Sequence, residues 1–469
     1  MVSFLLSIVA LIVGYAVYGK FVEKVFGADE NRPTPATTQN DGVDFVEMDW
    51  KRVFLIQFLN IAGLGPIFGA IAGALWGPVA FLWIVLGSIF AGATHDYFAG
   101  MLSIRHGGAT IAEIVGEYLG MTAKNVMRLF SVVLLILVGV VFINGPAGLL
   151  QNMTGINKFV FLGIIVVYYL VATVMPVDKV IGKVYPIFGA ALLIMGVGIM
   201  WGIMTQGYTI PEIQLTNMHP SAKSIFPFLF ITIACGAISG FHATQSPIMA
   251  RCIGNEKLGR KVFYGSMIAE GVIALIWAAA AMSFYGGVEG LSGAGSAAVV
   301  VNDISTTLMG TVGGILAVLG VVAAPITSGD TAFRSARLAI ADAMKIKQES
   351  VGSRFMIAVP LFAIGIALCF IDFTIIWRYF AWSNQTLATI VLWTSAVYLV
   401  RNGRNHWIAS APATFMTAVI TSYITVAPEG LGLGESIGIP VGIVCAVLAM
   451  GTFMAKSKSQ ANMDVTKAA

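Results

Sequence analysis

Long apolar segments recur along almost the whole chain, and they limit its possible folds more than any other feature. A bilayer-crossing helix needs about 20 apolar residues, and by that rule we count about thirteen spans. The predicted spans are residues 2–18, 53–74, 79–104, 126–143, 158–175, 184–205, 224–250, 262–284, 309–327, 353–372, 377–399, 406–427 and 435–455. Charged residues make up only 11% of the chain. We therefore expect an all-α integral membrane protein.

The distribution of Lys and Arg predicts the orientation of the chain in the membrane. If the C-terminus is cytoplasmic, the inner segments contain nearly all basic residues, and the outer loops contain only Lys223. Basic loops stay on the cytoplasmic side. The first span, 2–18, has no basic leader and no small-residue cleavage site, so we expect it to be retained. The sequence predicts a multi-pass protein of the cell inner membrane with its N-terminus outside and its C-terminus inside.

Two spans contain residues that break a helix. The span 53–74 includes the glycine-rich stretch Gly63–Pro66, and the span 224–250 includes Cys235–Pro247, which also combines glycine, polar residues and proline. Proline lacks the backbone donor that a helix requires, and glycine permits non-helical backbone. Within a membrane, a broken helix is tolerated where it faces protein or a water-filled cavity. Each of these spans is therefore predicted to be a discontinuous helix.

The two broken spans are five spans apart, so they cross the membrane in opposite directions. This arrangement is typical of an inverted repeat of five helices, with solute and ion bound between the breaks. It divides the chain into an extra N-terminal helix and cytoplasmic loop (1–52), a first repeat (53–205), a second repeat (206–400), and two C-terminal helices with a cytoplasmic tail (401–469). The alternative is that the glycines serve only close helix packing.

The breaks supply the candidate substrate-binding residues. Half-helix N-termini attract carboxylates, and free backbone carbonyls hold cations. The candidates are residues of the two breaks and polar side chains expected near them: Gln57, Asn60, Gly63, Gly65, Pro66, Ser239, Gly240, His242 and Gln385.

Ionisable residues within the spans are candidates for ion coupling, because such residues are costly in a bilayer and usually functional. His95 and Asp96 are adjacent in the span 79–104. They are interpreted as a proton relay or half of a metal site, with a purely structural pair as the alternative. Glu270 either carries a proton or pairs with a nearby arginine.

A third candidate group lies at the predicted inner end of the span 309–327. Thr327, Ser328 and Asp330 offer hydroxyl and carboxylate oxygens that suit a sodium ion. The same residues would also cap a separate interfacial helix, Asp330–Lys347. Both interpretations stay open at this point.

Several function classes find no support in the sequence. We find no GxxxxGK[ST] loop, so an ATP-driven pump is not expected. GxSxG and HExxH are also missing, and an enzyme is not expected. The four cysteines lack metal-ligand spacing, and a net charge of +4 gives no reason to expect nucleic acid as a partner. We expect a small-molecule solute and membrane lipid as partners, no metal, and no cofactor beyond a coupling proton or sodium ion. The oligomeric state stays open.

Seven stretches, in order along nearly the whole chain, carry a resemblance to a known family. They are Thr34–Thr38, Asp41–Asp44, Ile61–Pro66, Leu82–Asp96, Gly240–Pro247, Pro325–Asp330 with Arg334 and Arg337, and Trp382–Gln385. They resemble the carbon starvation protein A family of peptide transporters, in the amino acid–polyamine–organocation superfamily. Longer members usually have a His-His pair where this chain has Ile56 and Gln57, and Gln-Asp where it has His95-Asp96.

The resemblance implies a leucine-transporter-type core of five plus five helices in inverted repeat. It also implies uptake of peptides, or in some members pyruvate, during carbon limitation. We therefore expect a secondary active transporter that imports short peptides by alternating access, coupled to protons or sodium. A transporter of pyruvate or another small carboxylate is the alternative, although no Lys or Arg lies near either break. A membrane nutrient sensor or a channel is the alternative from another class.

Overall fold

The computed structural model describes residues 1–468 except 43, 174–177 and 349. The helices of the first half are α1 Val2–Val13, α2 Gly19–Phe26, α3 Pro35–Thr38, α4 Trp50–Ile61, α5 Gly65–Gly73, α6 Ala80–Leu86, α7 Ala93–Arg105, α8 Ile111–Leu119, α9 Met121–Thr154, α10 Lys158–Ala172 and α11 Asp178–Thr205. Those of the second half are α12 Phe230–Thr232, α13 Gly240–Ala250, α14 Gly265–Phe284, α15 Val288–Gly293, α16 Ala297–Ala317, α17 Ala324–Met344, α18 Val351–Leu368, α19 Phe373–Arg401, α20 Trp407–Val426 and α21 Glu435–Ala468. Short π or 3-10 turns join several of them.

In the described part of the chain, nine helices are long and apolar enough to cross a membrane, or ten if α4 and α5 count as one bent span. The outward faces of α1, α10, α18 and α21 expose many Leu, Ile, Val and Phe side chains. Such surfaces suit lipid as the surrounding solvent. The helical, multi-pass architecture is therefore confirmed, whereas the count of about thirteen spans and the inverted repeat stay predictions.

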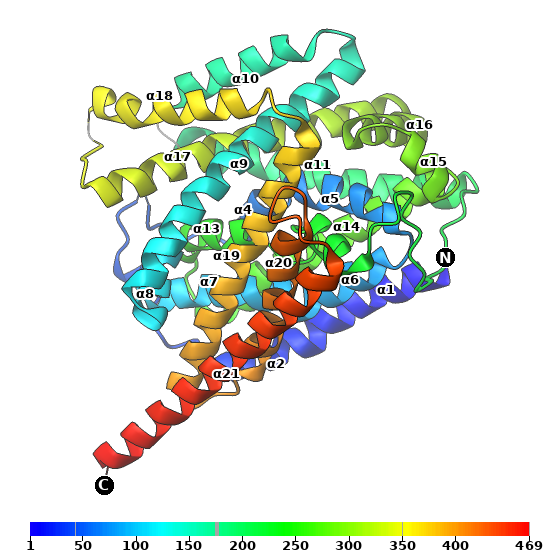
Figure 1. Ribbon diagram of the computed structural model, residues 1–469. Coiled ribbons are helices and arrows are strands. Elements are labelled where there is room, and N and C mark those ends of the chain that lie inside the picture. Colours follow the sequence, from blue (N-terminus) through cyan, green and yellow to red (C-terminus); the bar gives the residue numbers. More distant parts are fainter. Residues whose placement is uncertain (43, 174–177, 349, 469) are drawn as a thin grey trace.

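A central group of helices surrounds the two breaks (Figure 1). Helix α13 packs against α7, α4 and α19, and α14 packs against α4, α5 and α11. Helix α20 packs along α21, whose C-terminal end projects beyond the rest of the molecule (Figure 1). Helices α10 and α18 lie at the opposite end of the molecule from α2.

Both predicted breaks are present. Helix α4 ends at Ile61, and α5 starts at Gly65 with its axis turned by 48°. Pro66 lies in the first turn of α5, where its missing N–H is not needed for a helical hydrogen bond. In the second broken span, α12 ends at Thr232 and α13 begins at Gly240, so residues 233–239 form the break. The predicted stretch Cys235–Pro247 extended too far, because His242 and Pro247 already lie inside α13.

The prediction of a helix boundary near Asp330 is wrong. Helix α16 changes direction at Gly310, which has φ 58°, and then continues through a π turn (Val318–Ala323) into α17. Asp330 therefore lies inside α17 and does not cap a separate helix. The prediction ended the span at residue 327 because hydroxyl and charged residues follow it. The π turn just before Pro325 changes the local hydrogen bonding, and this accommodates a residue without a backbone donor.

A polar cluster ties the first helix to the core at the end of the molecule where α7 and α19 finish. Arg105 at the end of α7 binds the fully buried Glu256 through two nitrogens, each 3.1 Å from a carboxylate oxygen. The same guanidinium donates to Tyr398 Oη at 2.5 Å and to the carbonyl of Gly27 at 2.7 Å. One arginine thus joins α7, α19 and the segments that follow α2 and α13.

Candidate functional site

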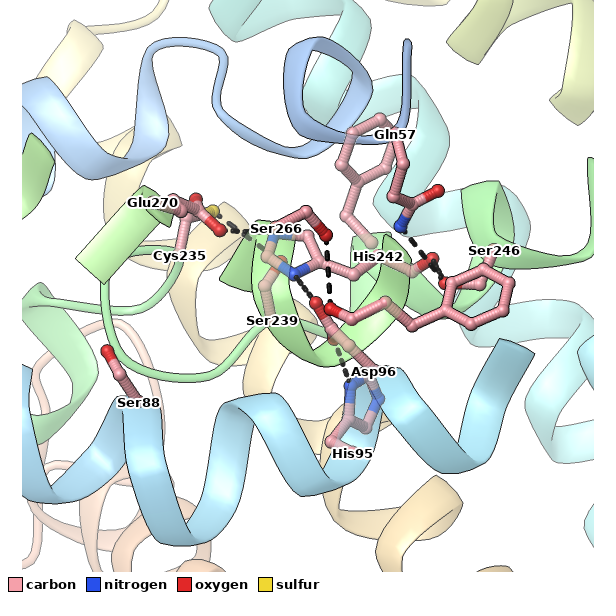
Figure 2. Close-up of polar contacts among 12 residues, drawn as sticks. Gln57, Ser88, His95, Asp96, Cys235, Ser239, His242, Ser246, Ser266 and Glu270 are labelled. Atoms are coloured by element: carbon pink, nitrogen blue, oxygen red, sulfur yellow. Dashed lines mark hydrogen bonds and ion pairs between the residues drawn. The ribbon is translucent and has the colours of Figure 1, made fainter. Parts of the chain in front are cut away.

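Four buried titratable side chains form a continuous row where α7, α13 and α14 meet (Figure 2). Asp96 Oδ1 lies 2.7 Å from His95 Nδ1, and Asp96 Oδ2 lies 2.8 Å from His242 Nδ1. On the other side of the same imidazole, His242 Nε2 lies 3.4 Å from Glu270 Oε2. All four side chains have no exposed surface. We call the row His95, Asp96, His242 and Glu270 the buried relay.

The geometry of the buried relay allows one proton to be shared between His242 Nε2 and Glu270. An ionised Asp96 accepts a hydrogen bond from each histidine, so both Nδ1 atoms carry hydrogen. A neutral His242 then presents the lone pair of Nε2 to Glu270. At 3.4 Å the two atoms are beyond the usual hydrogen-bond length, and a small helix movement would close the gap. Either Glu270 keeps the proton or His242 becomes a cation between two carboxylates.

Close backbone packing brings α7 to the second break. Gly92 lies in the π turn before α7, and a Cβ there would be 2.2 Å from the carbonyl oxygen of Ala237. Further along α7, a Cβ on Gly100 would lie 2.3 Å from the ring of Phe263. Small residues at both positions therefore allow the contact that aligns Asp96 with His242.

Asn384 of α19 caps the start of α13. Its Oδ1 accepts hydrogen bonds from the backbone N–H of Phe241 at 2.7 Å and from the Ser239 hydroxyl at 3.1 Å. Its Nδ2 donates to Cys235 Sγ at 3.2 Å. A half-helix N-terminus that was expected to be open to solute is therefore held by a side-chain amide. The candidate residues included Gln385 and left out its neighbour Asn384, although both lie in the same polar stretch of α19.

The two breaks touch each other. A Cβ on Gly65 would lie 2.3 Å from Cys235 Cβ, and a Cβ on Gly236 would lie 2.6 Å from Ala274 Cβ and 3.6 Å from Pro66 Cα. On the opposite side, Gly63 is in contact range of the Phe142 ring. A solute between the breaks therefore requires the breaks to separate.

The remaining substrate-binding candidates divide between the two breaks. Gln57 Nε2 donates to Ser246 Oγ at 3.3 Å, and Ser246 Oγ donates to the carbonyl of His242, which links α4 to the buried relay. Asn60 is buried on α4. Gln385 Nε2 donates to the Phe230 carbonyl at 2.5 Å, so it holds α12, the other half of the broken helix.

The third candidate group lies on α17, which packs mainly against α9. Thr327 bonds back to the carbonyl of Ala324, and Ser328 is fully buried. Asp330 lies 3.5 Å from Arg334, one turn further along the helix. These contacts of Thr327 and Asp330 are therefore made within α17, and they do not include the residues of the buried relay. Among the described residues, no group of three or more His, Cys, Asp or Glu could hold a metal ion.

Two broken helices packed against each other in a helical membrane protein are typical of the leucine-transporter fold. Solved structures support this fold. MhsT in complex with L-phenylalanine aligns with a TM-score of 0.54 at 15% identity, over 86% of this chain and 98% of MhsT. A histidine-to-alanine mutant of the Eremococcus coleocola manganese transporter aligns with a TM-score of 0.50 at 12% identity, over 87% of this chain and 98% of the transporter chain. At these identities the likeness concerns the fold alone.

The family model described as carbon starvation protein CstA matches residues 1–155 and 147–289, and the chain belongs to this family. An uncharacterized membrane protein of Haemophilus influenzae is 44% identical over 351 residues, 63% of this chain and 95% of its own length. The peptide transporter CstA of Escherichia coli is 28% identical over 339 residues, 58% of this chain and 48% of its own length. The pyruvate/proton symporter BtsT of the same organism is 27% identical over 340 residues, which are 58% of this chain and 47% of its own length. The chain thus matches about half the length of these named transporters.

Proposed function

We propose that this protein imports short peptides across the cytoplasmic membrane by alternating access, and that the buried relay couples the transport to protons. The observation that carries the proposal is the row from His95 to Glu270 beside the second break, in which neighbouring side chains lie 2.7 to 3.4 Å apart. Buried ionisable groups in a membrane are costly and are retained where they serve ion or solute movement.

The buried relay gives protonation a mechanical consequence. When His242 is a cation, it attracts Asp96 on α7 and Glu270 on α14 together, so α13 is held between them. When His242 is neutral and Glu270 is ionised, the lone pair of Nε2 faces a carboxylate, and the contact between α13 and α14 weakens. The protonation state therefore favours one packing of α13 over the other.

Solute binding acts on the same half-helix. The start of α13 presents the Phe241 N–H and the positive end of the helix dipole, which now face Asn384 Oδ1. A solute carboxylate would replace this amide oxygen with a charged acceptor. The residues around both breaks include no Lys or Arg, which favours a zwitterionic solute such as a peptide over a small acid such as pyruvate. The printed names of the relatives include both kinds of solute.

The solute assignment can be tested in proteoliposomes with labelled dialanine under an imposed proton gradient. We expect uptake that survives excess unlabelled pyruvate and that a sodium gradient does not drive. Uptake erased by pyruvate would replace the peptide proposal with a small-carboxylate carrier. Uptake driven by sodium alone would remove the buried relay as the coupling site. Downhill flux with no accumulation under either gradient would support the channel alternative.

The coupling assignment has its own test in Asp96→Asn. An asparagine retains one acceptor oxygen but presents an amide donor to the second histidine, which interrupts the row. We expect proton-driven uptake to fall about 100-fold or more, the lower end of the loss typical of removing a general acid or base. Exchange of labelled for unlabelled solute, which needs no net proton movement, should persist. Asp44→Asn, on an exposed loop, is the matched control. An unchanged pH dependence in Asp96→Asn would assign His95 and Asp96 a structural role.

A further inference from the structure

A groove lies on the surface of the molecule, away from the breaks. It has a volume of about 660 Å³ and lies between the end of α8, the start of α9, the last turns of α19 and the middle of α21. Its lining residues are Tyr118, Leu119, Thr122, Ala123, Val126, Ile390, Trp393, Val397, Val400, Arg401, Ala449, Thr452, Phe453, Lys456 and Ser457. We call it the α9–α21 groove.

The α9–α21 groove is apolar along its length and basic at one end. Arg401 is the last residue of α19, and Lys456 follows Phe453 by about one turn of α21. From Ile390 to Arg401 the wall of α19 extends roughly 16 Å, at 1.5 Å per residue. The lining includes no Asp or Glu. The groove is therefore matched to a molecule with a long apolar part and an anionic end.

The basic end is held in position. Arg401 donates through both terminal nitrogens to the backbone carbonyls of Glu117 and Tyr118, at 3.3 Å each, and its guanidinium lies 5.0 Å from the Tyr118 ring centroid. These bonds use two of its five N–H donors, so others remain for an anion. Lys456 on the opposite wall is exposed and adds three donors. Two cations on separate helices thus line the same groove.

The apolar wall is also fixed. Trp393 donates to Thr417 at 3.1 Å, which sets its ring orientation, and its ring lies 5.4 Å from that of Phe453. Tryptophan with basic residues one or two turns away is typical of the boundary between acyl chains and headgroups. Side chains of this kind can pack against an acyl chain along the groove.

We propose that the α9–α21 groove binds an anionic phospholipid, with its phosphate between Arg401 and Lys456 and an acyl chain along Trp393 and Phe453. A zwitterionic phospholipid carries its own ammonium group, which competes with the two basic side chains for the phosphate. Free phosphate lacks the chain that fills the apolar wall. The bound lipid joins α21 to α9 and α19, and α19 is the helix that places Asn384 on α13.

Native mass spectrometry of the full chain, delipidated and titrated with phosphatidylglycerol or phosphatidylcholine, tests this proposal. We expect phosphatidylglycerol to bind at least tenfold more tightly. The double variant Arg401→Gln, Lys456→Gln should lose this preference, and Ala449→Phe, which fills the apolar wall and keeps both charges, should lose binding. The matched control is Lys20→Gln, Lys24→Gln, which removes two exposed cations that do not line the groove. Equal binding of both lipids, or an unchanged preference in the Arg401 and Lys456 variant, would overturn the proposal. Inorganic phosphate that competes as well as the lipid would show a simple anion site instead.

Discussion

Direct contact between the two breaks makes Gly65 a position where one added carbon would force the breaks apart. In Gly65→Ala, the new Cβ would lie 2.3 Å from Cys235 Cβ and 2.4 Å from its Sγ. Contacts this short do not persist, so the breaks must move apart. Overpacking by one methyl group costs about 1–3 kcal/mol in a closely packed interior. Because the cost falls only on the state in which the breaks touch, the equilibrium shifts roughly 5- to 160-fold toward separated breaks.

Thiol labelling measures this shift directly. Cys235 is only 4% exposed when the breaks touch, so its alkylation reports their separation. In a chain with the other three cysteines replaced by alanine, we expect Gly65→Ala to raise the rate of Cys235 alkylation at least about fivefold. Dialanine uptake should fall, because the closed state that completes the transport cycle becomes costly. Gly65→Leu should abolish uptake while the protein stays in the membrane.

A rescue variant separates this reasoning from general damage. Cys235→Gly removes both atoms that the new methyl group would meet, so the double variant Gly65→Ala, Cys235→Gly should recover uptake relative to Gly65→Ala alone. The single variant Cys235→Gly measures the cost of losing the thiol. The reasoning is refuted if Gly65→Ala alkylates at the wild-type rate, or if the double variant shows only the sum of the two single losses.

Three further outcomes follow from the structure. Glu256→Gln removes the carboxylate that pairs with Arg105 and leaves the arginine charge unpaired, so the free energy of unfolding should fall by about 3–5 kcal/mol. An unchanged thermal midpoint in detergent would contradict this. Asn384→Ala removes the acceptor from the Phe241 N–H and should cost about 1–2 kcal/mol, whereas Asn384→Asp, which keeps an acceptor oxygen, should cost less; equal losses in thermal stability would argue against capping. Burial raises the pKa of the Cys252 thiol from 9.0 to about 11. A higher thiol pKa lowers the fraction of the reactive thiolate, so the alkylation of Cys252 at pH 8 should be about 100-fold slower than that of an ordinary thiol. Rapid labelling of a folded variant with Cys252 as its sole cysteine would contradict this environment.

Much of the fold could be predicted because lipid imposes strong constraints on composition. Apolar length located the helices, and the proline and glycine of Gly63–Pro66 located a real break. The boundary at Asp330 failed because the hydroxyls and the carboxylate that could cap a new helix instead continue an existing one, α17. The orientation of the termini and the four predicted units of the chain stay predictions, since the helices themselves do not distinguish one membrane side from the other.

The site could be predicted only as separate parts. His95, Asp96, His242 and Glu270 were each candidates, but their alignment depends on how α7, α13 and α14 are rotated about their axes. Adjacent residues on a helix point about 100° apart, so a small error in rotation exchanges one neighbour for another. For the same reason Asn384 was passed over in favour of the next residue along α19. An arginine partner was considered for Glu270, and the structure places a histidine there.

In the mechanism proposed above, the position of His242 would tie the proton to the solute more closely than the sequence suggested. It lies in the first turn of α13, directly after Phe241, whose N–H is bound by Asn384. A solute that replaced Asn384 would pull on the start of the same short helix that holds His242 against Asp96. The 3.4 Å gap to Glu270 would then change with solute binding. Coupling of this kind is reciprocal, because the free energy by which the solute shifts proton affinity equals that by which the proton shifts solute affinity. A change in the pH dependence of solute binding in Asn384→Ala is therefore expected even though Asn384 carries no proton of its own.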